Sequence, residues 1–199
     1  MLYEGFRKIF WGFILVFVEI HLMVIDILPD PIGYYLIFSG IRLVNHYFGF
    51  TNKGKQVALG LVFLSLPTLF IQNQSVIQMS GSSIYLSLIG IINLVLAFYL
   101  FQLMVSIAKQ REDDSLHQRT TTMFKIYMVT MFFVTFLEPF SINMTEGLKM
   151  WFIVFSAIFG LVINIFFLAL LLKYSKLSDG PSDRSSYTAE SEPAIGTHD

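Results

Sequence analysis

The sequence predicts an all-α integral membrane protein, a bundle of six transmembrane helices. Of its 199 residues, 55% are hydrophobic and only 14% are charged. Soluble proteins carry about one quarter charged residues, so much of this apolar surface needs lipid as its solvent. Apolar stretches also alternate with short polar segments along the chain, and this alternation sets the predicted number of spans at six.

The six predicted spans belong to one membrane domain over residues 1–177. They cover about residues 9–28, 32–48, 57–71, 84–108, 124–137 and 151–172. The first is expected to be retained, because charged residues interrupt it and no small-residue cleavage site follows. The third is the shortest, and Pro67 lies near its end. The fifth is expected to stop at Glu138, because Pro139 disfavours helix in the residue before it.

Basic residues lie on one side of the predicted bilayer. With the N-terminus inside, twelve of the thirteen Lys and Arg residues fall in inner segments, and only Lys149 falls in an outer one. Cytoplasmic segments carry such an excess. We therefore expect a multi-pass protein of the cell (cytoplasmic) membrane with both termini inside. The tail over residues 178–199 holds five acids and one arginine, has little to bury, and is expected to be disordered.

Glu19 is the most unusual residue, because it lies near the middle of the first predicted span. A charge there costs at least about 2.5–3.5 kcal/mol, so it needs a partner, a proton or water. Glu19 lies ten residues before Pro29, and Arg42 lies eleven after Pro31. A symmetrical hairpin would bring the two side chains together. The pair could couple transport, or it could only fix the helix register, with Arg42 reaching the inner face.

A Pro-Asp-Pro corner joins the first two predicted spans. Asp30 can cap the second helix, and Pro31 suits its first turn, where no N–H is needed. Gly33 would let the two backbones approach closely. Asp26 lies seven residues beyond Glu19 on the same helix face, so Asp26 and Asp30 form a candidate outer acidic entry for cations. Alternatively, Asp26 simply lies among lipid headgroups.

Asn93 and Asn164 are the other polar groups expected near the middle of the membrane, with Tyr99 at a similar depth. One interpretation is a substrate site lined by Glu19, Asn93 and Asn164, because transporters place their sites at the bilayer midplane. The other is that the amides hydrogen-bond between helices, which contributes about 0.6 kcal/mol on average.

The corner Leu28-Pro29-Asp30-Pro31-Ile32-Gly33-Tyr34, with Gly40 further on, resembles a hairpin of small multi-pass membrane proteins from low-GC Gram-positive bacteria. Those proteins typically have Leu-Pro-Asp-Phe-Ile-Gly-Tyr, then an apolar stretch that ends in glycine and a basic residue. Here Pro31 replaces the phenylalanine. The group is functionally uncharacterised, so the resemblance implies a bacterial origin and a hairpin geometry rather than an activity.

No enzyme motif such as HExxH, GxSxG or a phosphate loop occurs in the sequence. The chain has no cysteine, and its four histidines lack the spacing of metal ligands. No basic cluster indicates nucleic-acid binding. We therefore expect no metal or cofactor, and a non-enzymatic protein that acts through a membrane-protein partner or as a homo-oligomer, in an accessory or regulatory role. The alternative is a small proton- or cation-coupled transporter or channel that uses Glu19.

Overall fold

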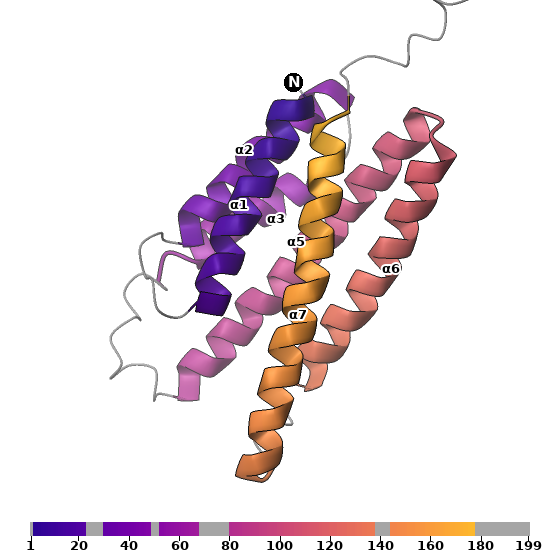
Figure 1. Cartoon of the computed structure of the whole chain (residues 1–199). Coiled ribbons are helices and arrows are strands. Elements are labelled where there is room, and N and C mark those ends of the chain that lie inside the picture. Colours follow the sequence, from indigo (N-terminus) through magenta and orange to yellow (C-terminus); the bar gives the residue numbers. More distant parts are fainter. Residues whose placement is uncertain (1, 23–29, 49–51, 68–79, 138–143, 178–199) are drawn as a thin grey trace, which may run out of the picture.

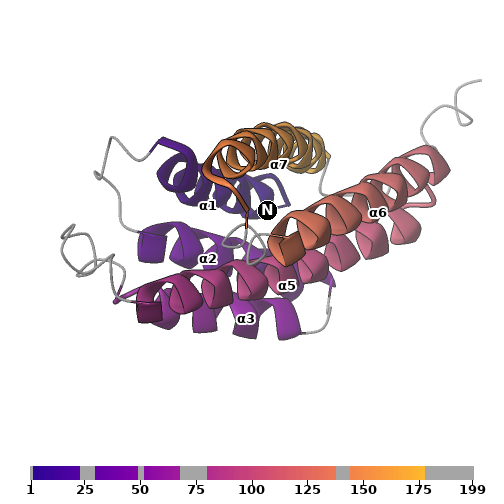
Figure 2. The same cartoon turned by 90° about the horizontal axis from the view of Figure 1, so that it is seen from below.

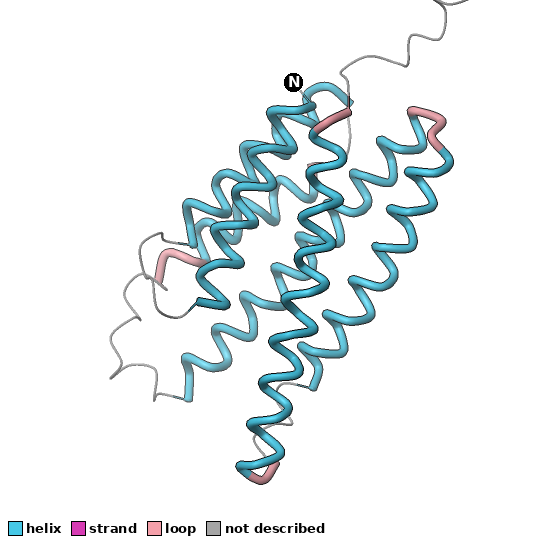
Figure 3. The backbone as a smooth tube through the Cα atoms, viewed as in Figure 1, coloured by secondary structure: helices cyan, strands magenta, loops and turns pink. Residues whose placement is uncertain are grey.

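The computed structural model describes residues 2–22, 30–48, 52–67, 80–137 and 144–177. Within these ranges every regular element is a helix (Figure 3). The helices are α1 (Leu2–Leu22), α2 (Asp30–Phe48), α3 (Lys53–Leu64), α5 (Ser80–Gln110), α6 (Asp114–Leu137) and α7 (Glu146–Ser175). The predicted all-α class is thus confirmed, and each helix overlaps one of the six predicted spans.

Three of the helices are long and apolar enough to cross a membrane. Among the described residues these segments are Ser87–Gln110, Asp114–Leu137 and Glu146–Ser175. By contrast, α3 has only 12 residues, about 18 Å at the helical rise, which is shorter than a hydrocarbon core of about 30 Å. The chain therefore has the helices that membrane insertion requires.

Helix bounds differ from the predicted spans mainly at polar ends. The helix α1 begins at Leu2, seven residues before the predicted span, and α6 begins at Asp114, ten residues before its span. The spans were delimited by apolar content, whereas helices continue through polar residues outside hydrocarbon. The helix α3 ends at Leu64 rather than at residue 71, and Pro67 follows closely. Residues 23–28, 68–71 and the tail 178–199 lie outside the described part of the chain.

The helices alternate in direction and form a ring in chain order. Each packs on its neighbours in the sequence, and α7 closes the ring on α1 (Figures 1 and 2). Phe6 and Phe13 of α1 contact Tyr174 and Phe167 of α7, with ring centroids 5.3 and 5.0 Å apart. The start of α1 therefore lies beside the end of α7.

Phe167 is the centre of the bundle. Its ring is fully buried and lies 5.0 Å from Phe13 of α1, 5.1 Å from Phe101 of α5 and 5.1 Å from Tyr127 of α6. Aromatic pairs of this kind contribute about 0.5–1.5 kcal/mol each beyond burial. Since lipid tails are as apolar as these rings, close packing rather than exclusion of water holds such helices together.

A short turn joins α5 and α6. The amide N–H groups of Glu112 and Asp113 donate to the carbonyls of Lys109 and Ala108, which is the Schellman arrangement that ends a helix. Glu112 takes the left-handed conformation that this motif requires, with φ of 53°. Asp113 then caps α6 by accepting a hydrogen bond from the Leu116 amide at 2.9 Å. The two caps in succession make α5 and α6 antiparallel neighbours.

Candidate functional site

Glycines set the contact between α1 and α2. A Cβ atom on Gly12 would lie 2.6 Å from the Gly33 carbonyl oxygen, and one on Gly40 would lie 2.5 Å from the Gly5 carbonyl oxygen. Real Cβ atoms do not come this close to a backbone oxygen. Each helix thus presents two glycines seven residues apart, and the backbones touch at both levels. This is the small-residue packing that membrane helices use.

The same contacts fix the register of the hairpin, and it is not the symmetrical one that the sequence analysis assumed. Gly5 faces Gly40 and Gly12 faces Gly33, so Arg42 lies level with Tyr3. Glu19 is sixteen residues further along α1, about 24 Å away along the helix axis. The expected Glu19–Arg42 contact is inconsistent with this register. The reason is that close glycine packing, rather than the position of the corner, determines how the helices align.

The other corner residues are placed only in part. The helix α2 begins at Asp30, and the buried Pro31 lies in its first turn. Proline has no backbone N–H, and this position needs none. Asp26 and Pro29 lie outside the described residues, and so does the side chain of Glu19. Arg42 is exposed on α2.

Asn164 links α7 to α6. The hydroxyl of the buried Tyr127 donates to Asn164 Oδ1 at 3.1 Å. The amide oxygen is thus occupied by a helix–helix hydrogen bond, in agreement with the structural interpretation of this residue. Asn93 on α5 has a buried Oδ1 for which no described residue provides a hydrogen-bond donor. The structure does not bring Asn93 and Asn164 into a shared hydrogen bond within the described part.

A second polar contact, centred on Tyr174, ties three helices together. The Tyr174 hydroxyl donates to the Met104 carbonyl of α5 at 2.9 Å and lies 2.8 Å from Thr120 Oγ1 of α6. Thr120 Oγ1 also lies 2.7 Å from the Leu116 carbonyl, to which it can donate. In the contact between the two hydroxyls, either Thr120 or Tyr174 can be the donor. All four residues are buried. Their hydrogen bonds therefore fix α5, α6 and α7 at the end of the bundle where α7 stops.

Tyr99 lines a small polar cavity between α2, α3 and α5. The cavity has a volume of about 80 Å³, and its polar lining comes from Asn45, Tyr99, Gln102 and Ser106. Gly54 allows the approach of α3, because a Cβ there would lie 3.1 Å from Tyr99 Cβ. The space suffices for a few water molecules. Its described lining includes no residue of α1, so it is a separate site from the one predicted around Glu19.

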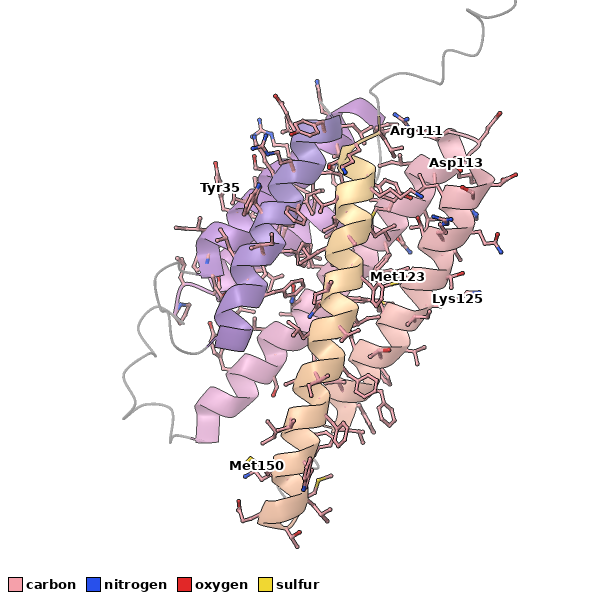
Figure 4. The ribbon with its side chains drawn as sticks, in the orientation of Figure 1. Tyr35, Arg111, Asp113, Met123, Lys125 and Met150 are labelled. Atoms are coloured by element: carbon pink, nitrogen blue, oxygen red, sulfur yellow. The ribbon has the colours of Figure 1, made fainter. Side chains whose placement is uncertain are left out.

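Charged residues gather at the α5–α6 turn, and none lines this cavity in the described part of the chain. Figure 4 shows Arg111 and Asp113 at the α5–α6 turn and Met150 near the opposite end of α7. The hydrogen bonds from the Leu116 amide and the Ser115 hydroxyl lower the pKa of Asp113. Among the described residues, no group of three His, Asp or Glu side chains lies close enough to hold a metal ion.

The glycine pairs could have been found in the sequence, because Gly5 and Gly12, like Gly33 and Gly40, are separated by one heptad. The Tyr174 contact carried no such signal, since it joins residues 54 and 70 positions apart. Comparison with known proteins adds no assignment for these sites. No family model matches this chain, and no curated protein or solved structure shows a significant match.

Proposed function

We propose that this chain is a six-span protein of the cell membrane, with both termini in the cytoplasm, that acts without catalysis by binding a partner helix in the membrane. The bacterial origin implied by the hairpin resemblance belongs to the same proposal. The observation that carries it is the exposed face of α6. Of the three helices able to cross a membrane, α6 is the least buried, at 11% against 39% for α5 and 22% for α7.

Along that face runs a stripe of exposed side chains with alternating spacings of four and three residues, which we call the α6 seam. Its members are Gln118, Thr122, Lys125, Val129, Phe132 and Phe136. This spacing is the heptad pattern by which two helices pack along a common seam. Met123 is turned toward α7, whereas Lys125 lies on the opposite side of α6 (Figure 4).

Lys125 indicates the chemistry of the partner. It lies eleven residues into α6, about 16 Å from the start of the helix, and apolar side chains follow it along the seam. Lys125 lies at the inner end of the predicted span 124–137, where a cation either faces the headgroups or pairs with an acid. We propose that the partner helix carries a carboxylate at this depth. Differently tagged copies of the chain distinguish a second copy of this chain from another protein as the partner.

A crosslinking experiment in membranes tests the seam. A photoreactive amino acid at Phe132 is expected to yield a protein adduct, and Lys125→Gln is expected to reduce its yield several-fold. The matched controls are the same photoreactive residue at Tyr35, exposed on α2 (Figure 4), and Arg119→Gln on an exposed position of α6 outside the seam. Equal adducts at Phe132 and Tyr35 would exclude the seam as the partner surface.

The topology can be tested directly, because the chain has no cysteine. Single cysteines at Ser115, in the first turn of α6, and at Gly147, in the first turn of α7, should react with a membrane-impermeant maleimide from opposite sides. In intact cells Gly147→Cys should be labelled, and Ser115→Cys should be labelled only after permeabilisation. Labelling of both from the same side would refute the proposed span count.

The second candidate function, coupled transport, is favoured by the polar cavity beside Tyr99. An experiment can decide whether transport depends on Glu19, as expected from the sequence, or on this cavity. In proteoliposomes, a flux that persists in Glu19→Gln and is lost in Tyr99→Phe would assign transport to the cavity. A flux lost only in Glu19→Gln would assign it to the midplane acid.

A further inference from the structure

An apolar groove separates α6 and α7 at the end of the bundle away from the α5–α6 turn. It has a volume of about 430 Å³, within the range of small-molecule sites. The main lining side chains are Val129, Phe133 and Leu137 of α6 and Phe152, Phe155 and Phe159 of α7. The hydroxyls of Thr130 and Ser156 add the little polarity that the walls have. The groove is thus suited to hydrocarbon.

The groove opens toward the surroundings of the bundle. Both of its walls belong to helices that are long and apolar enough to cross a membrane. Phe133, Phe155 and Phe159 on these walls are 62%, 55% and 60% exposed. A groove in that position faces lipid, so its occupant must come from the bilayer or from another membrane segment.

The size of the groove distinguishes these two occupants. From Val129 to Leu137 it extends along eight residues of α6, about 12 Å. A volume of 430 Å³ over that length gives a cross-section of about 36 Å², less than half of the roughly 80 Å² of a helix 10 Å across. This cross-section suits a single extended hydrocarbon chain, so we assign the groove to lipid rather than to a helix.

A cation lies about one helical turn before the first α7 residue of the groove. Lys149 precedes Phe152 by three residues and Ser156 by seven, so it shares their face of α7. Trp151, two residues further along, is 65% exposed, as is typical of a ring at the level of lipid headgroups. Lys149 therefore lies where the phosphate of a lipid would be when its chain lies along the groove.

We propose that the α6–α7 groove binds one acyl chain of an anionic glycerophospholipid, with Lys149 at the headgroup phosphate. The apolar walls select the hydrocarbon chain, and the lysine selects the negative charge. The site shares only Val129 with the α6 seam, so the lipid and the proposed partner helix can bind together.

The test uses the full chain in phosphatidylcholine vesicles that contain a minor fraction of phosphatidylglycerol with a diazirine on one acyl chain. After illumination, adducts should concentrate in residues 129–137 and 152–159. Ser156→Trp fills the groove and should reduce these adducts several-fold. Ala157→Trp, an exposed neighbour that does not line the groove, should leave them unchanged. If Ser156→Trp does not fold, Thr130→Leu on the opposite wall is the replacement.

Lys149→Gln tests the headgroup assignment. It should abolish the preference for the phosphatidylglycerol probe over the same probe in phosphatidylcholine, whereas Lys173→Gln, at the other end of α7, should not. An unchanged preference in Lys149→Gln would overturn the assignment of the phosphate. Adducts spread over all exposed faces of α6 and α7, or unchanged by a filled groove, would overturn the site itself. Loss of seam crosslinks with retained lipid adducts would instead refute only the proposed function.

Discussion

Replacement of Gly12 by alanine should separate α1 from α2. The new Cβ would lie 2.6 Å from the Gly33 carbonyl oxygen and 2.6 Å from Ile37 Cγ1, and ordinary contact begins at 3.4 Å. The backbone oxygen cannot rotate away, so the helices must move apart by about 0.8 Å. A gap of 0.5–1 Å removes a quarter to a half of each van der Waals contact. Overpacking of this kind typically costs about 1–3 kcal/mol.

Gly90→Ala is the matched control, because a Cβ on Gly90 of α5 meets nothing within 4 Å. Alanine favours helix over glycine by up to about 1 kcal/mol, so this variant should be as stable as the parent or more stable. Both free energies of unfolding can be measured by titration of the purified protein from mild detergent into dodecyl sulfate micelles. If Gly12→Ala and Gly90→Ala unfold at the same dodecyl sulfate fraction, the glycine contact and the register derived from it are wrong.

Four further outcomes are expected. Tyr174→Phe removes the hydroxyl that joins α5, α6 and α7 and should lower the free energy of unfolding by about 1 kcal/mol; unchanged detergent stability would show that these hydrogen bonds contribute nothing. The charge swap Glu19→Arg with Arg42→Glu should yield no more folded protein, by fluorescence-detected size exclusion, than either single change, because the register separates the two positions by about 24 Å; rescue by the double swap would restore the direct pair. Glu112→Gly should raise the melting temperature slightly. A residue other than glycine in the left-handed conformation costs about 1–2 kcal/mol, and the greater flexibility of glycine in the unfolded chain cancels part of the gain from removing that cost. A lower melting temperature would show that Glu112 is not strained. The pKa of Asp113 is lowered in the fold, so the stabilisation of the α6 cap by its carboxylate is present above the ordinary pKa near 3.9 and is lost as the pH falls through the lower folded value. Hydrogen exchange at the Leu116 amide should therefore accelerate in that acid range. A protection factor that does not depend on pH would count against the cap.

Some of the architecture followed from local features of the sequence. A low fraction of charged residues and long apolar runs predicted helices in lipid, and the three long apolar helices agree with this. Asp30-Pro31 indicated where α2 begins, whereas the predicted third span continued past Pro67 to residue 71 and α3 ends at Leu64. These features act over one or two helical turns, so they can be read without knowledge of the neighbours. Helix starts were less predictable, because polar first turns such as that of α6 do not differ from a loop in composition.

The site depended on tertiary structure. From the sequence alone, Glu19 and Arg42 were matched by counting from the corner, but the glycine pairs Gly5–Gly40 and Gly12–Gly33 decide the alignment of the two helices. Asn164 was predicted as a polar group at depth, whereas only packing shows that Tyr127 is its donor. The composition of each segment determines whether it prefers to lie in lipid and to form a helix, because both preferences depend on the residues of that segment alone. Register and hydrogen-bond partners depend on how closely two surfaces fit, and that closeness arises only when the helices pack.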